Sequence, residues 1–236
     1  MEGTDILKNE SILSAQLDTE ILMSKAINKN REYIILNHDN TLNEENLKYF
    51  KKLVQERATK KPIAYILNKK FFWKNEFYVN KNTLIPRPDT EIIVEQIFKV
   101  TKNKNNLRIL DIGVGSGCIL LSILKEKKSF YGTGIDISKN SLDISIINAK
   151  KLFVDKRVKF FQSDVDKFDQ GKYDLIVSNP PYINRNKIKY LERDVSKFEP
   201  KLALDGGLDG LSVVRKVIKK SSELLKKNGK FILEIG

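Results

Sequence analysis

Apolar residues in the first sixty positions recur every three or four residues, which is the spacing of one buried helix face. In the first predicted helix these positions are Leu13, Leu17, Ile21, Leu22 and Ala26. Asn43 is placed to cap a second helix, in which Leu47, Phe50, Leu53 and Val54 share a face. We expect residues 1–62 to form a small helical N-terminal domain. The pattern leaves open whether it is a packing appendage or contributes to substrate recognition.

Aromatic and polar residues alternate in the next segment. Residues 71–73 and 77–79 are mainly aromatic and flank the polar turn Lys74, Asn75 and Glu76. This pattern predicts a β-hairpin. The proline-rich residues 84–91 follow as an extended linker, and Asp89 or Thr90 is placed to cap the next helix. We therefore assign residues 63–88 to a hairpin and linker.

From residue 107 the chain alternates short apolar strands with longer amphipathic stretches. The strands are expected at residues 108–112, 131–135, 158–162, 173–177 and 230–235. The helices are expected to include residues 119–124, 138–152 and 213–225. This order predicts an α/β domain over residues 89–236, with a doubly wound, Rossmann-like parallel sheet. Because the fifth strand coincides with the end of the sequence, we expect the final strands of such a sheet to be missing after Gly236.

Composition narrows the class of protein but not its activity. The chain has 236 residues, 41% of them hydrophobic, and a net charge of +13. The excess charge is mostly lysine spread along the chain, so it indicates either an RNA-associated partner or a coding bias. With no secretory signal and no apolar run near the ~18 residues of a membrane span, we expect a cytoplasmic protein. The single Cys118 is expected to be an inert buried thiol, and His38 receives no role.

A glycine-rich turn joins the first predicted strand of the α/β domain to its helix. It comprises Asp111, Gly113, Val114, Gly115, Ser116 and Gly117. Such a turn lets the backbone approach a ligand, and the helix start offers unpaired N–H groups. The G-x-G-x-G spacing differs from the G-x-G-x-x-G of dinucleotide sites, which weakens that interpretation.

Two carboxylates follow the next two predicted strands. Asp136 is placed to accept both hydroxyls of an adenosine ribose, and Asp164 to accept an adenine amine. Each feature alone is also explained by helix capping or ordinary turn geometry. Together, at the carboxyl ends of consecutive strands, they predict a site for S-adenosylmethionine. We see no cluster of metal-ligating residues and expect no metal.

The fourth predicted strand leads into Ser178 and then into the tetrapeptide Asn179, Pro180, Pro181 and Tyr182. Both prolines lack an N–H and have a fixed φ, so the loop presents carbonyl oxygens in a preset geometry. Asn179 adds an amide, and Tyr182 adds a flat ring. The tetrapeptide alone is more typical of a proline-rich turn with a packed tyrosine. Beside a cofactor site, it is suited to hold a planar group that carries an NH₂.

The glycine turn, Asp136 and the tetrapeptide resemble those of class I methyltransferases that modify planar amino groups. Four further features narrow this resemblance: residues 62–66, the aromatic hairpin, residues 84–91, and residues 199–200 followed by residues 204–210. In that order they are similar to the protein-(glutamine) methyltransferases of peptide chain release factors. In two positions the chain differs from the usual pattern: Asn68 stands where glycine is common, and Val165 where an aromatic residue often lies near adenine.

The resemblance implies methylation of the side-chain amide nitrogen of the glutamine in the Gly-Gly-Gln motif of class I release factors, which modulates translation termination. It places Asp111, the glycine turn, Asp136, Asp164, Val165 and Asn179 at the cofactor. It places the tetrapeptide at the glutamine, with Asn179, Pro180 and Tyr182 in catalytic roles. The partner is then a release factor, with no membrane and no direct nucleic-acid binding expected.

Two other functions are compatible with these residues. The same tetrapeptide chemistry serves the exocyclic amine of a DNA or RNA base, although no aromatic and basic cluster for a flipped base is evident. The end of the chain at Gly236 suggests the other, a truncated protein that binds a release factor without catalysis.

Overall fold

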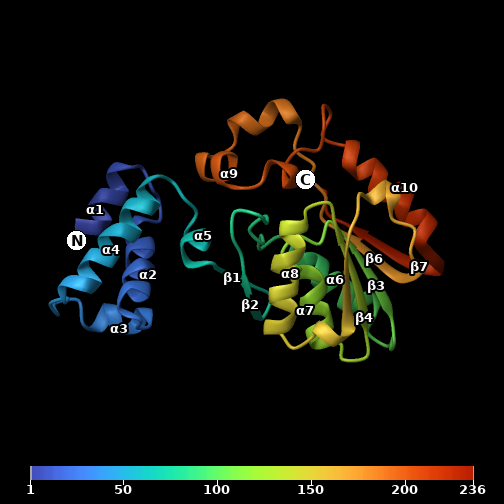
Figure 1. The fold of residues 1–236 in the computed structure, drawn as a ribbon, viewed down its shortest axis with the longest axis horizontal. Coiled ribbons are helices and arrows are strands. Elements are labelled where there is room, and N and C mark those ends of the chain that lie inside the picture. Colours follow the sequence, from blue (N-terminus) through green and yellow to red (C-terminus); the bar gives the residue numbers. More distant parts are fainter. Residues whose placement is uncertain (1, 236) are drawn as a thin grey trace. The chain divides into compact units, whose positions relative to one another are not determined.

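The computed structural model describes residues 2–235 and divides the chain into two compact units (Figure 1). The first unit comprises the chain up to Asn68 together with Arg193–Phe198. The second comprises Lys69–Glu192 and the chain from Glu199 onward. All of the cavity-lining residues discussed below belong to the second unit.

The first unit is helical. Its helices are α1 (Glu2–Asn9), α2 (Ala15–Ile27), α3 (Arg31–Leu36), α4 (Glu44–Ala58), α5 (Ile63–Leu67) and α9 (Arg193–Phe198). The predicted cap of α4 is confirmed, because the Asn43 side chain accepts a hydrogen bond from the Asn46 N–H. Leu13 and Leu17 are exposed, so their assignment to a buried face was wrong. Since α2 begins only at Ala15, Leu13 precedes the helix and does not share its face.

A buried ion pair joins α2 to α4. Arg57 Nε lies 2.7 Å from Asp18 Oδ2, and both side chains are almost fully buried. Arg57 Nη1 also donates to the Lys61 carbonyl, so the guanidinium holds the turn that follows α4. A charge buried in this way is retained only when it is paired and hydrogen-bonded.

Asn68 ends α5 in the left-handed conformation, with φ of 55°. Glycine is the usual residue at such a helix end because it lacks a Cβ, and asparagine is among the next best tolerated. Asparagine in place of the usual glycine at position 68 is therefore compatible with this backbone conformation.

The predicted hairpin is present and opens the second unit. Strands β1 (Lys69–Phe72) and β2 (Asn75–Tyr78) pair antiparallel. Phe72 and Phe77 are fully buried and meet edge to face, with ring centroids 6.2 Å apart. This geometry is favourable for aromatic pairs and fixes the inner side of the hairpin.

The second unit contains a five-stranded parallel sheet, as the sequence predicts. Its strands are β3 (Arg108–Ile112), β4 (Tyr131–Asp136), β5 (Val158–Gln162), β6 (Tyr173–Ser178) and β7 (Leu225–Leu233). Their spatial order is β5-β4-β3-β6-β7. The chain thus moves outward from β3 to β5 and then returns to the other side of β3. Ligands bind such sheets at this reversal, beyond the carboxyl ends of the strands.

The last strand differs from the prediction at its start. β7 begins at Leu225 rather than at residue 230, and its register with β6 shifts between Tyr173 and Leu175. Residues 226–229 carry no apolar side chain and so gave no strand signal, and Asn228 has a φ of 64°. Positions in such an irregular stretch lack the alternation by which strands are identified.

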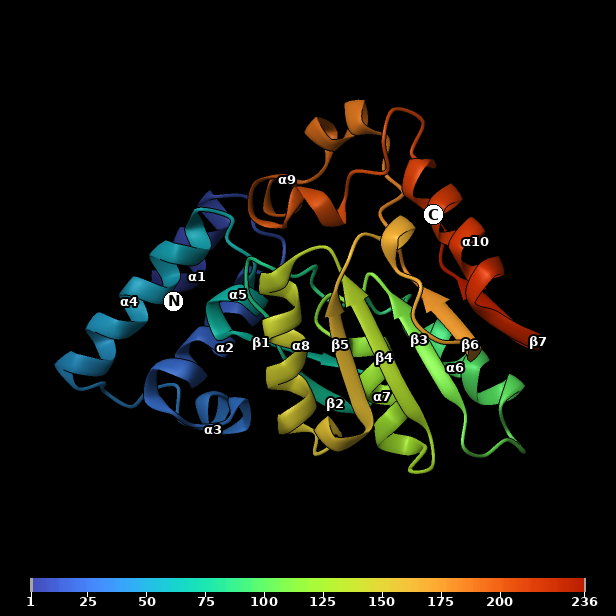
Figure 2. The same cartoon turned by 45° about the vertical axis from the view of Figure 1, so that its right-hand side comes forward.

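Helices cover both faces of the sheet (Figure 2). They are α6 (Glu91–Val100), α7 (Cys118–Glu126), α8 (Lys139–Lys151) and α10 (Ser212–Leu224). On one face Val217 and Leu224 of α10 pack against a cluster that includes Leu110, Ile112 and Ile176. On the other face α7 packs against β3 and β4, with α6 and α8 beside it. The doubly wound fold class is therefore confirmed.

Four short 3₁₀ helices complete the second unit. They are η1 (Asp155–Arg157), η2 (Val165–Lys167), η3 (Arg185–Tyr190) and η4 (Lys201–Ala203). Within residues 2–235, no helix combines the length and the apolar character that crossing a bilayer requires.

Candidate active site

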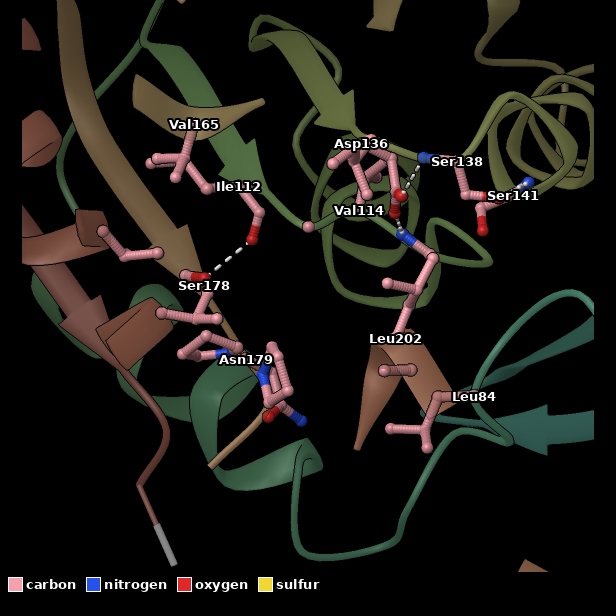
Figure 3. Close-up of a pocket in the computed structure, with 18 of the residues that line it drawn as sticks. Leu84, Ile112, Val114, Asp136, Ser138, Ser141, Val165, Ser178, Asn179 and Leu202 are labelled. Atoms are coloured by element: carbon pink, nitrogen blue, oxygen red, sulfur yellow. Dashed lines mark hydrogen bonds between the residues drawn. The ribbon is translucent and has the colours of Figure 1, made fainter. Parts of the chain in front are cut away.

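A cavity of about 530 Å³ opens at the carboxyl ends of the parallel strands (Figure 3). Its walls come from seven segments: the linker before α6, the glycine turn after β3, the end of β4, the end of β5, the tetrapeptide after β6, the loop that contains η4, and the first turns of α10. Volumes of a few hundred to ~1,000 Å³ are typical of sites for small molecules and cofactors. The cavity therefore lies where the strand order predicts a ligand.

The glycine turn is fixed by backbone hydrogen bonds and faces the cavity. The Gly113 and Val114 N–H groups both donate to the Ile135 carbonyl at 2.9 Å. Gly113 has a φ of +76°, and a Cβ on it would meet no atom within 4 Å. Because Gly113 has no side chain and faces open space, a ligand can approach its backbone closely.

A polar stripe on α8 holds this turn from behind, and sequence reasoning missed it. Ser145 Oγ donates to the Gly115 carbonyl at 2.7 Å, and Asn148 Nδ2 donates to the Ser116 carbonyl at 2.9 Å. Asn148 is fully buried and also bonds both the N–H and the carbonyl of Tyr78. The available signal was polar residues at helical spacing on the side of α8 that packs inward.

Asp136 ends β4 and contributes a carboxylate to the cavity wall. Its Oδ2 accepts from the Gly115 N–H and its Oδ1 from the Ser138 N–H, both at 2.9 Å. Burial raises the pKa of Asp136, and these two N–H groups oppose that rise. A carboxylate has about four acceptor positions, so each oxygen retains capacity for a ligand hydroxyl.

Asp164 and Val165 also line the cavity. Asp164 Oδ1 accepts from the Asp166 N–H and so caps η2. Lys216 of α10 lines the same wall, and its pKa is raised by the ion pair with Asp166 and by the charge of Asp164. The role of Asp164 toward adenine stays a prediction, and no motif pointed to Lys216.

Asp111 and Gly117 were predicted as cofactor residues but are not among the cavity-lining residues. Asp111 is 1% exposed beneath the turn. Burial raises the pKa of Asp111 to about 7, with the Leu120 N–H lowering it and the charge of Asp136 raising it further. At Gly117 (φ +81°), a Cβ would lie 2.7 Å from Leu121 Cδ1, so this glycine permits close packing at the start of α7.

The raised pKa of Asp111 predicts a pH-dependent stability. The folded protein binds a proton at Asp111 up to about pH 7, whereas the unfolded chain releases it near the ordinary value of 3.8. The contribution of Asp111 to the free energy of unfolding therefore falls as the pH rises from about 4 to about 7. We expect the free energy of unfolding of Asp111→Asn, relative to that of the native chain, to be higher at pH 8 than at pH 5. Urea unfolding of both proteins at the two pH values measures this change. The same difference in free energy at both pH values contradicts the prediction.

The tetrapeptide begins immediately after β6 and is tied to β3. Ser178 Oγ, fully buried, donates to the Ile112 carbonyl at 2.6 Å (Figure 3). Asn179 is half-buried, and its Nδ2 donates to Thr90 Oγ1 at 3.2 Å. Pro180 and Pro181 follow on the cavity wall.

Tyr182 is 36% exposed and is not among the residues that line the cavity. Burial of part of the ring raises the pKa of Tyr182, and the nearby carboxylate of Glu234 raises it further. The structure thus brings Asn179, Pro180 and Pro181 together with the glycine turn and Asp136. The catalytic role of Tyr182 at the glutamine stays a prediction.

The loop of residues 204–210 supports the chain that leaves the tetrapeptide. The Ile183 N–H donates to the Leu204 carbonyl, and the Gly206 N–H donates back to the Ile183 carbonyl. Gly210 has a φ of +81°, and a Cβ on it would lie 2.6 Å from the Tyr182 carbonyl oxygen. The glycines of this loop therefore permit direct contact between two backbones.

We expect Gly210→Ala to lower both the stability of the protein and the activity of the site that the tetrapeptide lines. A non-glycine residue in the left-handed region lowers the free energy of unfolding by roughly 1–2 kcal/mol. The clash with the Tyr182 carbonyl also displaces the last residue of the tetrapeptide. Gly171→Ala is the matched control. Gly171 also has a positive φ, of +83°, but a Cβ added there would first meet the flexible end of the Arg108 side chain rather than backbone. Urea unfolding and turnover should show a similar backbone cost in both variants but lost activity only in Gly210→Ala. Equal activity in the two variants argues against this support role.

Glu199 connects two walls of the cavity. Its carboxylate accepts from Arg87 Nη2 at 2.6 Å and from the Ile85 N–H at 3.1 Å. Arg87 belongs to the linker before α6, whereas Pro200 and Leu202 belong to the loop that contains η4. Because Glu199 is buried, this charge-assisted pair holds the two segments in one arrangement.

Comparison with known proteins agrees with this architecture. A model described as the PrmC N-terminal domain matches residues 1–67, and one described as a methyltransferase domain matches residues 103–235. The release factor glutamine methyltransferase of Caulobacter vibrioides is 37% identical over 233 residues, which cover 98% of this chain and 81% of that protein. The chain belongs to the release factor glutamine methyltransferase family. The family expected from the sequence motifs is thereby confirmed.

Three further known proteins are similar to this chain. The release factor glutamine methyltransferase of Clostridium botulinum is 39% identical over 239 residues, which cover all of this chain and 84% of that one. The bifunctional methyltransferase of Rickettsia conorii is 36% identical over 260 residues, and the match covers 50% of its length. This chain therefore spans about half of that relative. Among solved structures, a SAM-dependent methyltransferase from Geobacter sulfurreducens matches 62% of this chain and 47% of its own, with a TM-score of 0.40 and 18% identity.

Proposed function

We propose that this chain transfers a methyl group from S-adenosylmethionine to the side-chain amide nitrogen of the glutamine in the Gly-Gly-Gln motif of class I peptide chain release factors. One observation carries the proposal: a single cavity joins a ligand-accessible glycine turn and Asp136 to Asn179 and Pro180, in a member of this family. A translation factor as substrate places the reaction in the cytoplasm. The partner is then a protein, and neither a membrane nor direct nucleic-acid binding is required.

Several features fit S-adenosylmethionine. Gly113 offers bare backbone at the cavity, and Asp136 offers spare acceptor positions for ribose hydroxyls. Asp164, Val165 and Ile137 line the adjoining wall, where an adenine ring would lie. When bound, the cofactor supplies a methyl group on a sulfonium, which needs no further activation by a metal or a strong base.

The tetrapeptide would then bind and orient the glutamine amide. An amide nitrogen is a weak nucleophile because its lone pair is delocalised into the carbonyl. Asn179 Oδ1 and the Pro180 carbonyl would accept its two N–H groups and aim the nitrogen. Orientation of this kind can lower a barrier by roughly 7–11 kcal/mol. Tyr182 would limit movement of the amide plane.

Methyl transfer from labelled S-adenosylmethionine tests the proposal. The acceptors are a purified class I release factor, the same factor with its Gly-Gly-Gln glutamine replaced by alanine, total RNA and DNA. We expect label only in the unaltered release factor. Label confined to nucleic acid would move the function to base methylation. A chain that binds S-adenosylmethionine and the factor but transfers no label to any acceptor would have a binding role instead.

A further inference from the structure

An ion pair joins two walls of the cavity at the end that lies beyond β5. Lys216 of α10 places its Nζ atom 2.6 Å from Oδ2 of Asp166 in η2. Lys216 also lines the cavity, as does Val165, the residue before Asp166. The Lys216 side chain is 46% exposed, so other residues of the protein cover only part of its alkyl stem. The stem is therefore available to contact a ligand at this end of the cavity.

The two partners of this ion pair stand on a common apolar base. Phe168 and Val217 are buried in one cluster, against which Val165 packs. Asp164 Oδ1 accepts from the Asp166 N–H, which fixes the backbone of η2. Because a packed interior yields little, η2 and α10 are held at a set separation, and the ion pair fixes the course of the lysine stem between them.

The apolar lining of the cavity is entirely non-aromatic. Of the side chains in residues 2–235, no aromatic one lines the cavity. Aromatic rings are the usual partners of a nucleobase, because a base stacks its flat face on them. The apolar residues that η2 and α10 contribute to the wall are Val165, Val213 and Val217, all with short side chains. A planar base bound beside them needs another side chain to cover its face.

A lysine stem can provide such cover. Its methylene groups lie along apolar surface while the ammonium stays in water or pairs with a carboxylate. Because Lys216 lines the cavity and Asp166 holds its ammonium, the stem lies along the cavity wall. The ion pair thus directs an apolar segment to the place where an aromatic side chain is lacking.

We propose that Lys216 determines how tightly the chain retains the adenine of its methyl donor: its stem covers the ring, and Asp166 is a positioning residue that holds the stem in place. This inference rests on the cofactor of the function proposed above and does not depend on which group accepts the methyl. The contribution of Lys216 is then the same for every ligand that carries adenosine, whatever its tail.

Lys216→Ala is the first test, measured by titration calorimetry with S-adenosylmethionine, S-adenosylhomocysteine and adenosine. We expect all three dissociation constants to rise by about tenfold, because the variant uncovers the same adenine face in each complex. Lys216→Met keeps an unbranched apolar stem but loses the ion pair, so it should weaken binding by only about threefold. Lys219→Ala is the control, because Lys219 is exposed on the same helix and is not among the cavity-lining residues.

Turnover gives a second readout. With saturating S-adenosylmethionine, kcat of Lys216→Ala for release-factor methylation should stay within about twofold of the native value, whereas KM for the cofactor should rise about tenfold. This split is expected because the adenine cover is the same before and during methyl transfer.

A double-mutant cycle distinguishes positioning from a structural role of Asp166. Asp166→Asn releases the lysine head, and we expect it to weaken adenosine binding by about threefold in the native background. In the Lys216→Ala background the same substitution should have no further effect, because no stem remains to be held. Equal losses in the two backgrounds would mean that Asp166 supports η2 directly, which contradicts the positioning role.

The outcomes separate this inference from the proposed function. A native chain that binds S-adenosylmethionine but transfers no methyl to the release factor overturns the proposed function, while calorimetry still decides the role of Lys216. Binding of all three ligands by Lys216→Ala within about twofold of the native constants overturns that role. Weaker binding of S-adenosylmethionine with unchanged binding of adenosine overturns it too, because Lys216 would then act on the tail. If urea unfolding shows that Lys216→Ala is not folded, Lys216→Met decides by the same criteria.

Discussion

The Asn179→Ala variant is expected to lose methyl transfer almost completely, with kcat reduced by about 1,000-fold or more. Removal of one well-placed hydrogen-bonding group from an active site commonly costs 10²–10³ in rate. Here the loss should be at the upper end, because the substrate nitrogen is intrinsically weak and depends on orientation. The Asn179 side chain bonds the Thr90 hydroxyl and lines the cavity. Its removal therefore eliminates both the hydrogen bond to Thr90 and the acceptor proposed for the substrate amide.

Single-turnover measurements with saturating S-adenosylmethionine and a release factor check this expectation, since they report chemistry apart from product release. Cofactor affinity should weaken but remain measurable, because the glycine turn and Asp136 are unchanged. Asn186→Ala provides a matched control, as Asn186 is exposed and lies a few residues further along the same segment. Near-normal turnover in Asn179→Ala would remove Asn179 from the mechanism.

Replacing Asp136 by alanine is expected to weaken S-adenosylmethionine binding by about 100-fold or more. The substitution removes the acceptors proposed for the two ribose hydroxyls. It also leaves the Gly115 and Ser138 N–H groups without their partner. Hydrogen bonds to a charged group contribute roughly 1.5–3 kcal/mol each, and each 1.4 kcal/mol is a tenfold change in affinity.

Titration calorimetry with S-adenosylmethionine measures this change directly, and urea unfolding shows whether the variant remains folded. The control is Asp143→Ala, which removes an exposed carboxylate on α8 that pairs with Lys139 across one helical turn. A dissociation constant within about threefold of the native value would exclude Asp136 as the main polar anchor of the cofactor.

The elements that could be predicted are those whose signal is local. Buried parallel strands appear as short apolar runs, so β3 and β5 were predicted with their observed bounds. The glycine turn and the tetrapeptide are contiguous, so their chemistry was evident without a fold. The cap at Asn43 follows the same rule, because its partner lies three residues away.

Features that depend on distant partners could not be predicted. Asn148 meets Tyr78 across 70 positions in the sequence, and Arg87 meets Glu199 across 112. No periodicity marks such pairs before the fold brings them together. The burial of Asp18 and Arg57 has the same origin, since each charge is acceptable only beside the other.

The fully buried amide of Asn148 joins the hairpin to the glycine turn, because it bonds the Tyr78 backbone and the Ser116 carbonyl at once. Any ligand that stiffens the turn therefore also restrains the hairpin, and the free energy of this coupling is the same in both directions. Protection of the Tyr78 amide proton from exchange with solvent then reports cofactor occupancy from outside the cavity. Equally, a partner that binds the aromatic hairpin would raise the affinity for S-adenosylmethionine before the partner's own side chain reaches Asn179.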